Sequence, residues 1–249
     1  MIKAERQQLI ISHVSKDQKV LLSDLSALLS VSEDTVRRDI KELSDQGLLK
    51  AVRGGAISHS PIPLHFRDRE RYDVSHKEII AQKAQQFIRD GQVVLFDSGT
   101  SALAVATQLP KERKITAITN SFPVAAVLED HPNAEVIFIG GRLNKTAFST
   151  SGHEVIRTLS GVSPDVCFLG ICSIDVNHGV TGKDYEDSQV KKMMVERARY
   201  VIALSTLEKI GTAEPYLICE AQRLDAIITD MEPDHEGLQV YTAAGIAIV

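Results

Sequence analysis

The sequence predicts an α/β protein in two unequal parts, and three observations support this division. From residue 76 onward, continuous apolar runs of strand length alternate with amphipathic helical stretches, which is typical of a mostly parallel sheet covered on both faces. Residues 1–57 differ, because three short helical stretches precede a basic, glycine-containing stretch. Between them, residues 58–75 hold Pro61, Pro63 and a run of mixed charge, which favours a linker.

The composition indicates a globular protein without membrane segments. Of the 249 residues, 43% are hydrophobic and 24% are charged, proportions that are sufficient for a real core. No apolar run reaches the ~18 residues that span a bilayer, and the first residues lack a signal-peptide pattern, so a cytoplasmic location is expected. Cys167, Cys172 and Cys219 have no CxxC spacing, which favours reduced thiols over disulfides or a metal site.

Three short elements are predicted before the central helix of the first domain. Residues 4–15 have apolar side chains at helical spacing. Val20 and Leu21 can pair as a short strand. Ser23 has the side chain of an N-cap, which predicts a short helix over residues 24–29.

The central helix of the first domain is predicted to begin after Ser32, which has N-cap chemistry. Val36, Ile40 and Leu43 then recur at spacings of four and three and form one apolar stripe. Gly47 has the residue type that ends helices at the C′ position. The pattern predicts an amphipathic helix with its other sides free for polar contacts.

A two-stranded wing is predicted after this helix. Residues 48–52 and the residues after Gly55 can pair across a basic turn. Three helices and a wing form the winged helix-turn-helix plan, in which the third helix enters the major groove of double-stranded DNA. Arginine bonds bidentately to guanine, while other basic side chains and a close-approaching glycine backbone hold phosphates. The residues predicted to contact DNA are Ser32, Thr35, Arg37, Arg38, Lys41, Arg53 and Gly54.

The charge of the first domain leaves a different interpretation open. Residues 1–60 carry nine Lys and Arg against eight Asp and Glu, and the net charge of the whole chain is −5, so the first domain is near neutral and the rest is acidic. The central helix itself carries Asp34, Asp39 and Glu42, and pairs such as Asp34–Arg38 can form along it. A helical domain with a solvated surface, or one that binds protein and not DNA, therefore also fits the pattern.

Residues 31–56, VSEDTVRRDIKELSDQGLLKAVRGGA, resemble the signature of DeoR-type bacterial transcriptional regulators. In that family an S-x-x-T-x-R-R-D-x-x-x-L run forms the recognition helix, and an end with arginine, two glycines and alanine forms the wing. The resemblance implies a double-stranded DNA operator as partner. Operators of such proteins tend to be repeated, so a homodimer or homotetramer is expected. The matching residues are Ser32, Thr35, Arg37, Arg38, Asp39, Leu43, Arg53, Gly54, Gly55 and Ala56.

The second domain, predicted over residues 76–249, alternates helices and strands. Its strands are apolar throughout, so both faces of the sheet are expected to be covered. Helices are predicted over residues 76–88, 101–109, 123–129, 155–161 and 188–198. Strands are predicted over residues 93–96, 115–119, 135–141, 165–172, 200–205 and 225–230.

Polar residues and glycines follow three of these strands. The first turn is DSGTS at residues 97–101, the second contains Thr119 and Asn120, and the third contains Gly140 and Gly141. Ligands bind at the carboxyl ends of strands in open α/β sheets, and helix N-termini attract phosphate. Converging turns therefore predict a pocket for a phosphorylated small molecule. Each turn alone fits a structural role equally well, because Gly, Ser and Thr end many strands.

The second domain is similar to the sensor domain of DeoR-type regulators over most of residues 77–230. The resemblance implies the fold shared by ribose-phosphate and glucosamine-phosphate isomerases and CoA transferases, and a sugar phosphate or related phosphorylated metabolite as ligand. The chain departs from the family at residues 206–209, where Thr-Leu-Glu-Lys replaces Asp-Ser-Ser-Lys or Asp-His-Ser-Lys, so an unusual or unphosphorylated effector stays open. The residues assigned to the effector pocket are Asp97, Ser98, Gly99, Thr100, Ser101, Thr119, Asn120, Gly140, Gly141, Gly170, Lys191 and Lys209.

The whole pattern predicts a sequence-specific DNA-binding regulator, most simply a repressor of sugar or carbon metabolism genes that its effector releases from the operator. The alternative is a sugar-phosphate isomerase with an accessory helical domain. Isomerisation needs a base near C1 and C2 of the sugar, and Asp97, Asp165 and Asp175 are available carboxylates. No pair of residues has a spacing that enforces acid–base work, so no catalytic residue, cofactor or metal is assigned.

Overall fold

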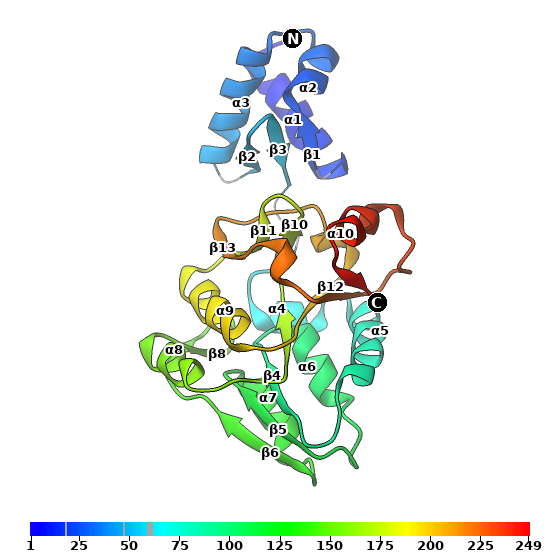
Figure 1. Ribbon diagram of the computed structural model, residues 1–249. Coiled ribbons are helices and arrows are strands. Elements are labelled where there is room, and N and C mark those ends of the chain that lie inside the picture. The colour runs from blue at the N-terminus through cyan, green and yellow to red at the C-terminus, as the bar shows by residue number, and fades with distance from the viewer. Residues whose placement is uncertain (18, 47, 59–61) are drawn as a thin grey trace.

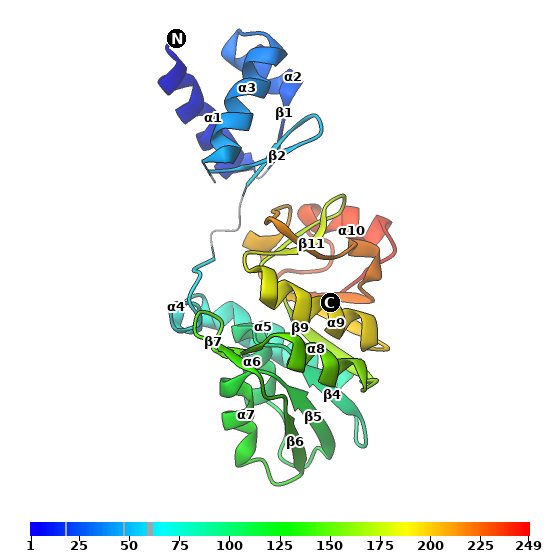
Figure 2. The ribbon, with the colours of Figure 1, turned by 90° about the vertical axis from the view of Figure 1, so that its left-hand side faces the viewer.

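The computed structural model describes the chain except for residues 18, 47 and 59–61. A small N-terminal domain lies beside a larger α/β domain (Figures 1 and 2). The predicted helix end at Gly47 lies outside the described residues. No helix in the described part of the chain combines the length and the apolar character that a membrane crossing requires.

The N-terminal domain contains three helices and a small antiparallel sheet (Figure 1). The sheet has the strand order β1-β3-β2, so the predicted two-stranded wing gains β1 as a third strand. The predicted winged helix-turn-helix plan is confirmed. Its elements are α1 (Lys3–Asp17), β1 (Lys19–Leu21), α2 (Leu22–Leu29), α3 (Glu33–Asp45), β2 (Lys50–Val52) and β3 (Gly55–Ile57).

Helix α3 begins and packs as its sequence predicts. Ser32 is the N-cap residue, and its side chain accepts a hydrogen bond from the amide of Thr35. Val36, Ile40 and Leu43 are buried and belong to one hydrophobic cluster with side chains of α1 and α2. The apolar stripe therefore determines which face of α3 turns inward.

The predicted N-cap role of Ser23 is wrong. Helix α2 begins at Leu22, directly after β1, and Ser23 lies inside its first turn, where its hydroxyl contacts the carboxylate of Asp24. The amide of Leu22 donates to the carbonyl of Gly54 in the wing at 2.8 Å. A long-range backbone bond thus satisfies a helix amide that a side-chain cap usually satisfies.

Acidic residues of α3 are paired with α1 inside the N-terminal domain. Asp39 is 2% exposed and accepts a hydrogen bond from Arg6, with 2.5 Å between Nε and Oδ2. Glu42 forms an ion pair with Lys3 at 2.6 Å. Because Asp39 and Glu42 pair with residues of α1, they are not the partners of the outward basic side chains of α3.

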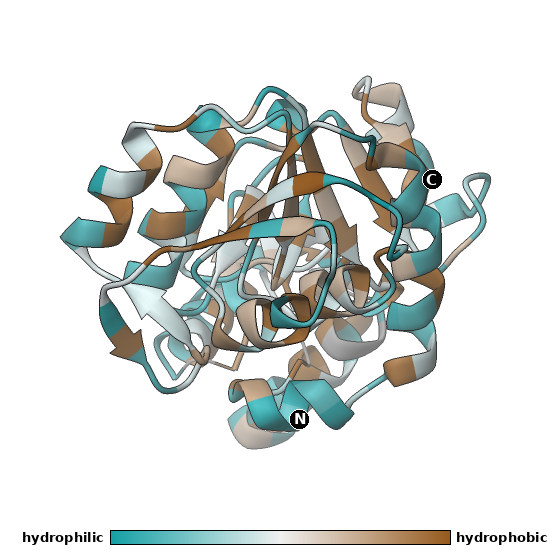
Figure 3. Ribbon diagram, turned by 90° about the horizontal axis from the view of Figure 1, so that it is seen from below, coloured by the Kyte–Doolittle hydropathy of each residue, from teal (hydrophilic) through white to brown (hydrophobic). Residues whose placement is uncertain are grey.

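The larger domain is built on a seven-stranded parallel sheet with the order β15-β14-β12-β9-β4-β5-β6. Apolar strands lie in the middle of the domain, between helices (Figure 3). The strands are β4 (Val93–Phe96), β5 (Ile115–Thr119), β6 (Ala134–Phe138), β9 (Val166–Gly170), β12 (Val201–Ser205), β14 (Ala226–Thr229) and β15 (Ala247–Ile248).

Helices cover the two faces of this sheet in two groups, each with its own hydrophobic cluster. One face carries α5 (Val74–Ala84), α6 (Thr100–Thr107) and α7 (Phe122–Glu129). The other carries α8 (His153–Ser160), α9 (Tyr185–Arg197) and α10 (Gln239–Ala243).

Several short strands that the sequence pattern does not predict flank this sheet. Strands of three or four residues are too short to show a hydrophobic period, so pairing across the chain decides them. An antiparallel sheet joins β10 (Ser173–Asp175), β11 (Gly179–Gly182) and β13 (Tyr216–Cys219), and a hairpin joins β7 (Arg142–Asn144) and β8 (Ser149–Ser151).

Two expectations fail at the borders of the larger domain. Residues 58–75 are more than a linker, because they contain α4 (Phe66–Arg71), whose Phe66 ring packs against Phe148 with 6.1 Å between centroids. Strand β6 forms an edge of the sheet, and its Ile137 and Phe138 are 41% and 37% exposed. Cover on both faces therefore does not extend to β6.

Substitution of Asp39 tests the α1–α3 pairing. Asp39→Ala leaves Arg6 without its buried partner, and we expect the free energy of unfolding of the N-terminal domain to fall by about 1–3 kcal/mol. Calorimetric unfolding of the full chain measures this loss. Asp45→Ala, on the exposed side of the same helix, is the matched control and should change stability by less than about 0.5 kcal/mol. Equal losses in the two variants would contradict a structural role for the Arg6–Asp39 pair.

Candidate functional site

The outward face of α3 and the wing form a basic groove. Its cavity volume is about 620 Å³, and Arg37, Lys41, Arg53 and Gly54 line it. The three basic side chains are exposed. A groove of this kind presents guanidinium and ammonium groups to a phosphate backbone and to base edges.

The other predicted DNA contacts do not line this groove. Ser32, Thr35 and Arg38 lie on the same helix, outside the groove lining, and Arg38 is exposed. The predicted pair Asp34–Arg38 is not the one that forms: Asp34 pairs with Arg37 at 2.6 Å, one residue earlier. Both partners are largely exposed, so this pair is weak and a phosphate can replace the carboxylate.

The wing has a backbone that requires glycine. Gly54 has a φ of +89°, in the region that favours glycine. A Cβ atom on Gly55 would lie 1.9 Å from the carbonyl oxygen of Val20 on β1. The turn therefore holds Arg53 at the tip of the wing.

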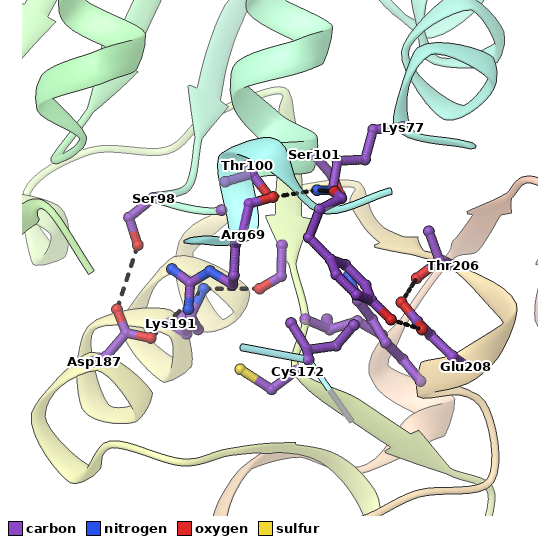
Figure 4. Close-up of a pocket in the computed structure, with 16 residues that line it drawn as sticks. Arg69, Lys77, Ser98, Thr100, Ser101, Cys172, Asp187, Lys191, Thr206 and Glu208 are labelled. Carbon is purple, nitrogen blue, oxygen red and sulfur yellow. Dashed lines mark hydrogen bonds and ion pairs between the residues drawn. The ribbon is translucent and has the colours of Figure 1, made fainter. Parts of the chain in front are cut away.

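A second candidate site lies at the carboxyl ends of three adjacent strands, β4, β9 and β12 (Figure 4). Residues 98–101 follow β4, residues 170–172 end β9, and residues 206–209 follow β12. This is the sheet edge where ligands bind in open α/β folds. The cavity volume is about 40 Å³, which is room for roughly three water-sized groups.

A buried ion pair forms the floor of this pocket. Lys191 of α9 is 3% exposed, and its ammonium group contacts the Asp97 carboxylate and donates to the carbonyl of Gly170 at 2.8 Å. Asp97 also accepts from the amide of Gly170 at 2.9 Å. Burial disfavours the charge on Lys191, but Asp187 and Asp97 outweigh it and raise the lysine pKa. Both charges of this pair are therefore satisfied within the protein.

Lys209 and Arg69 bring positive charge to the pocket, and neither forms an ion pair with a carboxylate among the described residues. The Lys209 side chain is 5% exposed, and its ammonium group has no hydrogen bond or ion pair within the described part of the chain. Burial lowers the Lys209 pKa to about 8. Arg69 donates to the carbonyl of Leu64 at 3.0 Å and lies over the Phe66 ring.

The neighbouring carboxylates already have partners. Glu208 accepts from the Tyr72 hydroxyl at 2.6 Å and from Thr206 at 3.2 Å. The bond to Glu208 raises the Tyr72 pKa to about 12. Asp187 accepts from Ser98 at 3.4 Å and lies 3.7 Å from Lys191 (Figure 4). The pocket therefore offers free cations and occupied acceptors, an arrangement that suits an anion.

The N-terminus of α6 adds neutral donors to the pocket. The amides of Thr100, Ser101 and Ala102 have no acceptor among the described residues, and Thr100 and Ser101 line the cavity. First-turn amides of a helix bind phosphate oxygens because the helix dipole favours negative charge there.

The predicted effector residues separate into two groups. Ser98, Gly99, Thr100, Ser101, Gly170, Lys191 and Lys209 line the pocket, and Asp97 holds Lys191 behind it.

Thr119, Asn120, Gly140 and Gly141 do not line this pocket, which corrects the expectation that the three turns converge. Asn120 contacts the β7–β8 hairpin, where its side chain donates to the carbonyl of Thr150 at 2.7 Å, and the Thr119 hydroxyl accepts from the amide of Ser121. A Cβ atom on Gly141 would lie 2.9 Å from the Ser151 carbonyl oxygen. Asn120 of the second turn and Gly141 of the third turn thus lie against a hairpin that the sequence pattern did not predict.

Several pocket residues were missed by sequence reasoning. Arg69 and Tyr72 lie in a segment predicted to be a linker, so no sequence signal placed them beside the strands. Glu208 was noted as a departure from the family pattern but was not assigned to the site. The lining also contains further residues that were not assigned to the site: Ile62, Lys77, Ile171, Cys172, Asp187 and Thr206.

Family models match both domains. The DeoR-like helix-turn-helix domain matches residues 6–61, and the DeoR C terminal sensor domain matches residues 73–231. The chain belongs to the DeoR family of transcriptional regulators. It shares this family with proteins that match along nearly their whole length.

Three curated relatives illustrate this DeoR-family likeness. The chain is 31% identical to the HTH-type transcriptional regulator GlpR of Haloferax volcanii, covering 100% of this chain and 98% of that protein. It is 32% identical to the HTH-type transcriptional repressor GlcR of Bacillus subtilis, covering 100% and 96%. It is 29% identical to the glycerol-3-phosphate regulon repressor of Escherichia coli, covering 97% and 96%.

Among solved structures, the DeoR-family chain is similar to ribose 5-phosphate isomerase A from Methanocaldococcus jannaschii. The match has 15% sequence identity and a TM-score of 0.40, and it covers 53% of this chain and 52% of that one.

The lowered pKa of Lys209 predicts a pH-dependent anion site. Lys209 loses its proton as pH rises through about 8, so affinity for sulfate, whose charge is constant, should fall up to about tenfold between pH 7.5 and pH 9. The free energy of unfolding should change in the opposite direction. Between about pH 8 and pH 10.5 Lys209 is mostly deprotonated in the folded chain and mostly protonated in the unfolded chain. The contribution of Lys209 to stability therefore rises with pH in this range.

Sulfate titration by calorimetry checks the affinity change. Lys209→Arg keeps a charge at every pH in this range and should flatten the profile. A wild-type affinity that is constant from pH 7.5 to 9 would contradict the assignment of Lys209 to the anion.

Proposed function

We propose that this protein is a sequence-specific transcriptional repressor of sugar or carbon metabolism genes, released from its operator by a phosphorylated sugar or a related anionic metabolite. The observation that carries the effector half is the pocket in which Lys209, Arg69 and the first residues of α6 line one cavity. The carboxylates of Asp187 and Glu208 in the same lining already have partners within the protein. The observation that supports the DNA half is the exposed basic groove between α3 and the wing.

The effector class follows from the donor set. Two cationic side chains and a helix N-terminus suit a tetrahedral dianion such as a phosphate ester. Glu208 and Asp187 at the pocket wall can accept hydrogen bonds from sugar hydroxyl groups. A relative named as the repressor of a glycerol-3-phosphate regulon supports this proposal.

The pocket favours binding over catalysis. Asp97 is the carboxylate nearest the predicted loop, but Lys191 and the Gly170 amide occupy its Oδ2 oxygen. Asp97 also does not line the cavity, so it is not placed to take a proton from a ligand there. His178 pairs with Asp175 at 2.7 Å, and neither residue lines the pocket. We therefore infer a sensor and not a sugar-phosphate isomerase.

We further infer a cytoplasmic homodimer or homotetramer. The N-terminal domain carries few outward basic residues and is nearly neutral as a whole, so one copy makes few phosphate contacts. Two or more copies held together by the larger domains would bind a repeated operator with useful affinity.

Loss of two arginines tests the DNA half. Operator duplexes selected from a random pool should bind the full chain, and Arg37→Ala with Arg38→Ala should weaken binding at least about tenfold and lower the salt slope by about one to two. Fluorescence anisotropy at several salt concentrations measures both. Arg157→Ala with Lys192→Ala removes the same charge from exposed positions of α8 and α9 and should leave binding unchanged. Undiminished binding by the α3 variant would exclude it as the recognition helix.

A ligand screen tests the effector half. A phosphorylated sugar at 100 times its Kd should stabilise the chain by about 2.7 kcal/mol, visible as a higher Tm. Lys209→Met removes the buried cation and should abolish the rise. If no phosphorylated compound raises Tm at millimolar concentration, the proposed effector class is wrong.

A further inference from the structure

One wall of the effector pocket comes from the segment between the two domains. This interdomain segment, residues 62–72, contributes Ile62, Arg69 and Tyr72 to the cavity lining. Arg69 projects from α4 toward the side where Asp187 and Lys191 lie (Figure 4). Arg69, one of the cations of the site, therefore comes from the interdomain segment and not from the sheet or its loops.

Few contacts hold the interdomain segment over the pocket. Lys77 of α5 donates to the carbonyls of Arg69, at 2.5 Å, and Tyr72. The Tyr72 hydroxyl donates to Glu208 on the opposite wall. The amide of Phe66 donates to the carbonyl of Thr146 at 2.8 Å. Apart from the packing of the buried Phe66 ring on Phe148, the contacts named here are single hydrogen bonds to residues outside the central sheet, so the segment can shift without disturbing the buried strands.

The cavity is small for a sugar phosphate. Its 40 Å³ holds about three water-sized groups, so a sugar phosphate enclosed by these walls needs a wider site. The remaining walls are strand ends and a buried ion pair, which cannot move apart cheaply. A second cavity of about 30 Å³ lies against Ile62 and Arg69 and shares Cys172 and Asp187 with the first. Displacement of the interdomain segment would join the two.

The interdomain segment is also connected to the wing. Lys183 donates to the carbonyl of Ile62 at 2.8 Å and lies 3.8 Å from the carboxylate of Glu214. The carbonyl of Glu214 accepts from Lys50 of β2 at 2.6 Å. The amide of Ala213 donates to the carbonyl of Ser58, at 3.3 Å. Residues 213–214 thus touch both the wing and the chain that leaves it.

We propose that Arg69 binds the anionic group of the effector together with Lys209, and that the effector displaces the interdomain segment and thereby changes the placement of the wing through Lys183, Glu214 and Lys50. This inference rests on the proposed effector function. Arg69 is thereby a ligand-binding residue. The change at the pocket reaches the wing through the contact between Ile62 and Lys183 of the sensor domain. A ligand acts in this way only if it prefers the displaced arrangement.

The binding half is tested with inorganic phosphate on the full chain. Arg69→Ala should weaken the phosphate affinity at least about tenfold, as judged from Tm against concentration. Arg71→Ala, an exposed arginine of the same helix outside the cavity, should match the wild type. If Arg69→Ala binds like the wild type while Lys209→Met does not, the site stands and the role of Arg69 is overturned. If phosphate and phosphorylated sugars leave the wild-type Tm unchanged, the proposed effector function fails first.

Hydrogen exchange tests the signal. Ribose 5-phosphate, glucose 6-phosphate and glycerol 3-phosphate are each compared with inorganic phosphate. Any of the three that raises Tm should change exchange in residues 48–57 and 62–72 several-fold, whereas phosphate, which fits the present cavity, should not. Lys183→Ala should keep the rise in Tm and lose the change at the wing; Lys192→Ala is the matched control on α9. A sugar phosphate that raises Tm but leaves wing exchange as in the unliganded chain overturns the proposal.

Discussion

The buried pair of Lys191 and Asp97 is the constraint on which the sensor site depends. It ties α9 to the end of β4 and, through both backbone groups of Gly170, to the end of β9. The two strand ends approach so closely that a Cβ atom on Gly170 would lie 2.9 Å from the Cα of Gly99. Breaking a buried pair of this kind typically costs about 3–5 kcal/mol, so the floor of the pocket is rigid. Because Lys191 and Asp97 pair with each other, neither needs Lys209 or Arg69 as a partner, and these two cations remain available to a ligand.

The N-terminal domain uses charge by the same logic. The acidic residues of α3 left its DNA contacts open in the sequence. Two of them, Asp39 and Glu42, face α1, where they pair with Arg6 and Lys3. The basic side chains of α3 are then the ones that face outward beside the wing. In both domains, internal ion pairs determine which charges are left for a partner. Net charge, which averages over both sets, says little about either site.

The sequence predicted what depends on local pattern. Helix α3 was predicted from Ser32, its N-cap, and from the helical spacing of Val36 and Leu43, and both signals are local. The apolar strands of the large sheet were likewise evident from the sequence. Predictions failed where distant residues decide. Ser23 lost its capping role to a backbone bond from the wing, and Asn120 was taken up by a hairpin with no period of its own. Arg69 was missed because a helix of six residues in a charged, proline-containing stretch looks like a linker.

The proposed function and the proposed signal together require that an anion in the sensor pocket and the operator on α3 compete through the interdomain segment. The most direct measurement is the operator Kd of the full chain as a phosphorylated sugar that raises its Tm is added. The account predicts that this Kd rises at least about tenfold and reaches a plateau, and that the operator weakens sugar binding by the same factor. An operator Kd that stays constant while the pocket is saturated would contradict it.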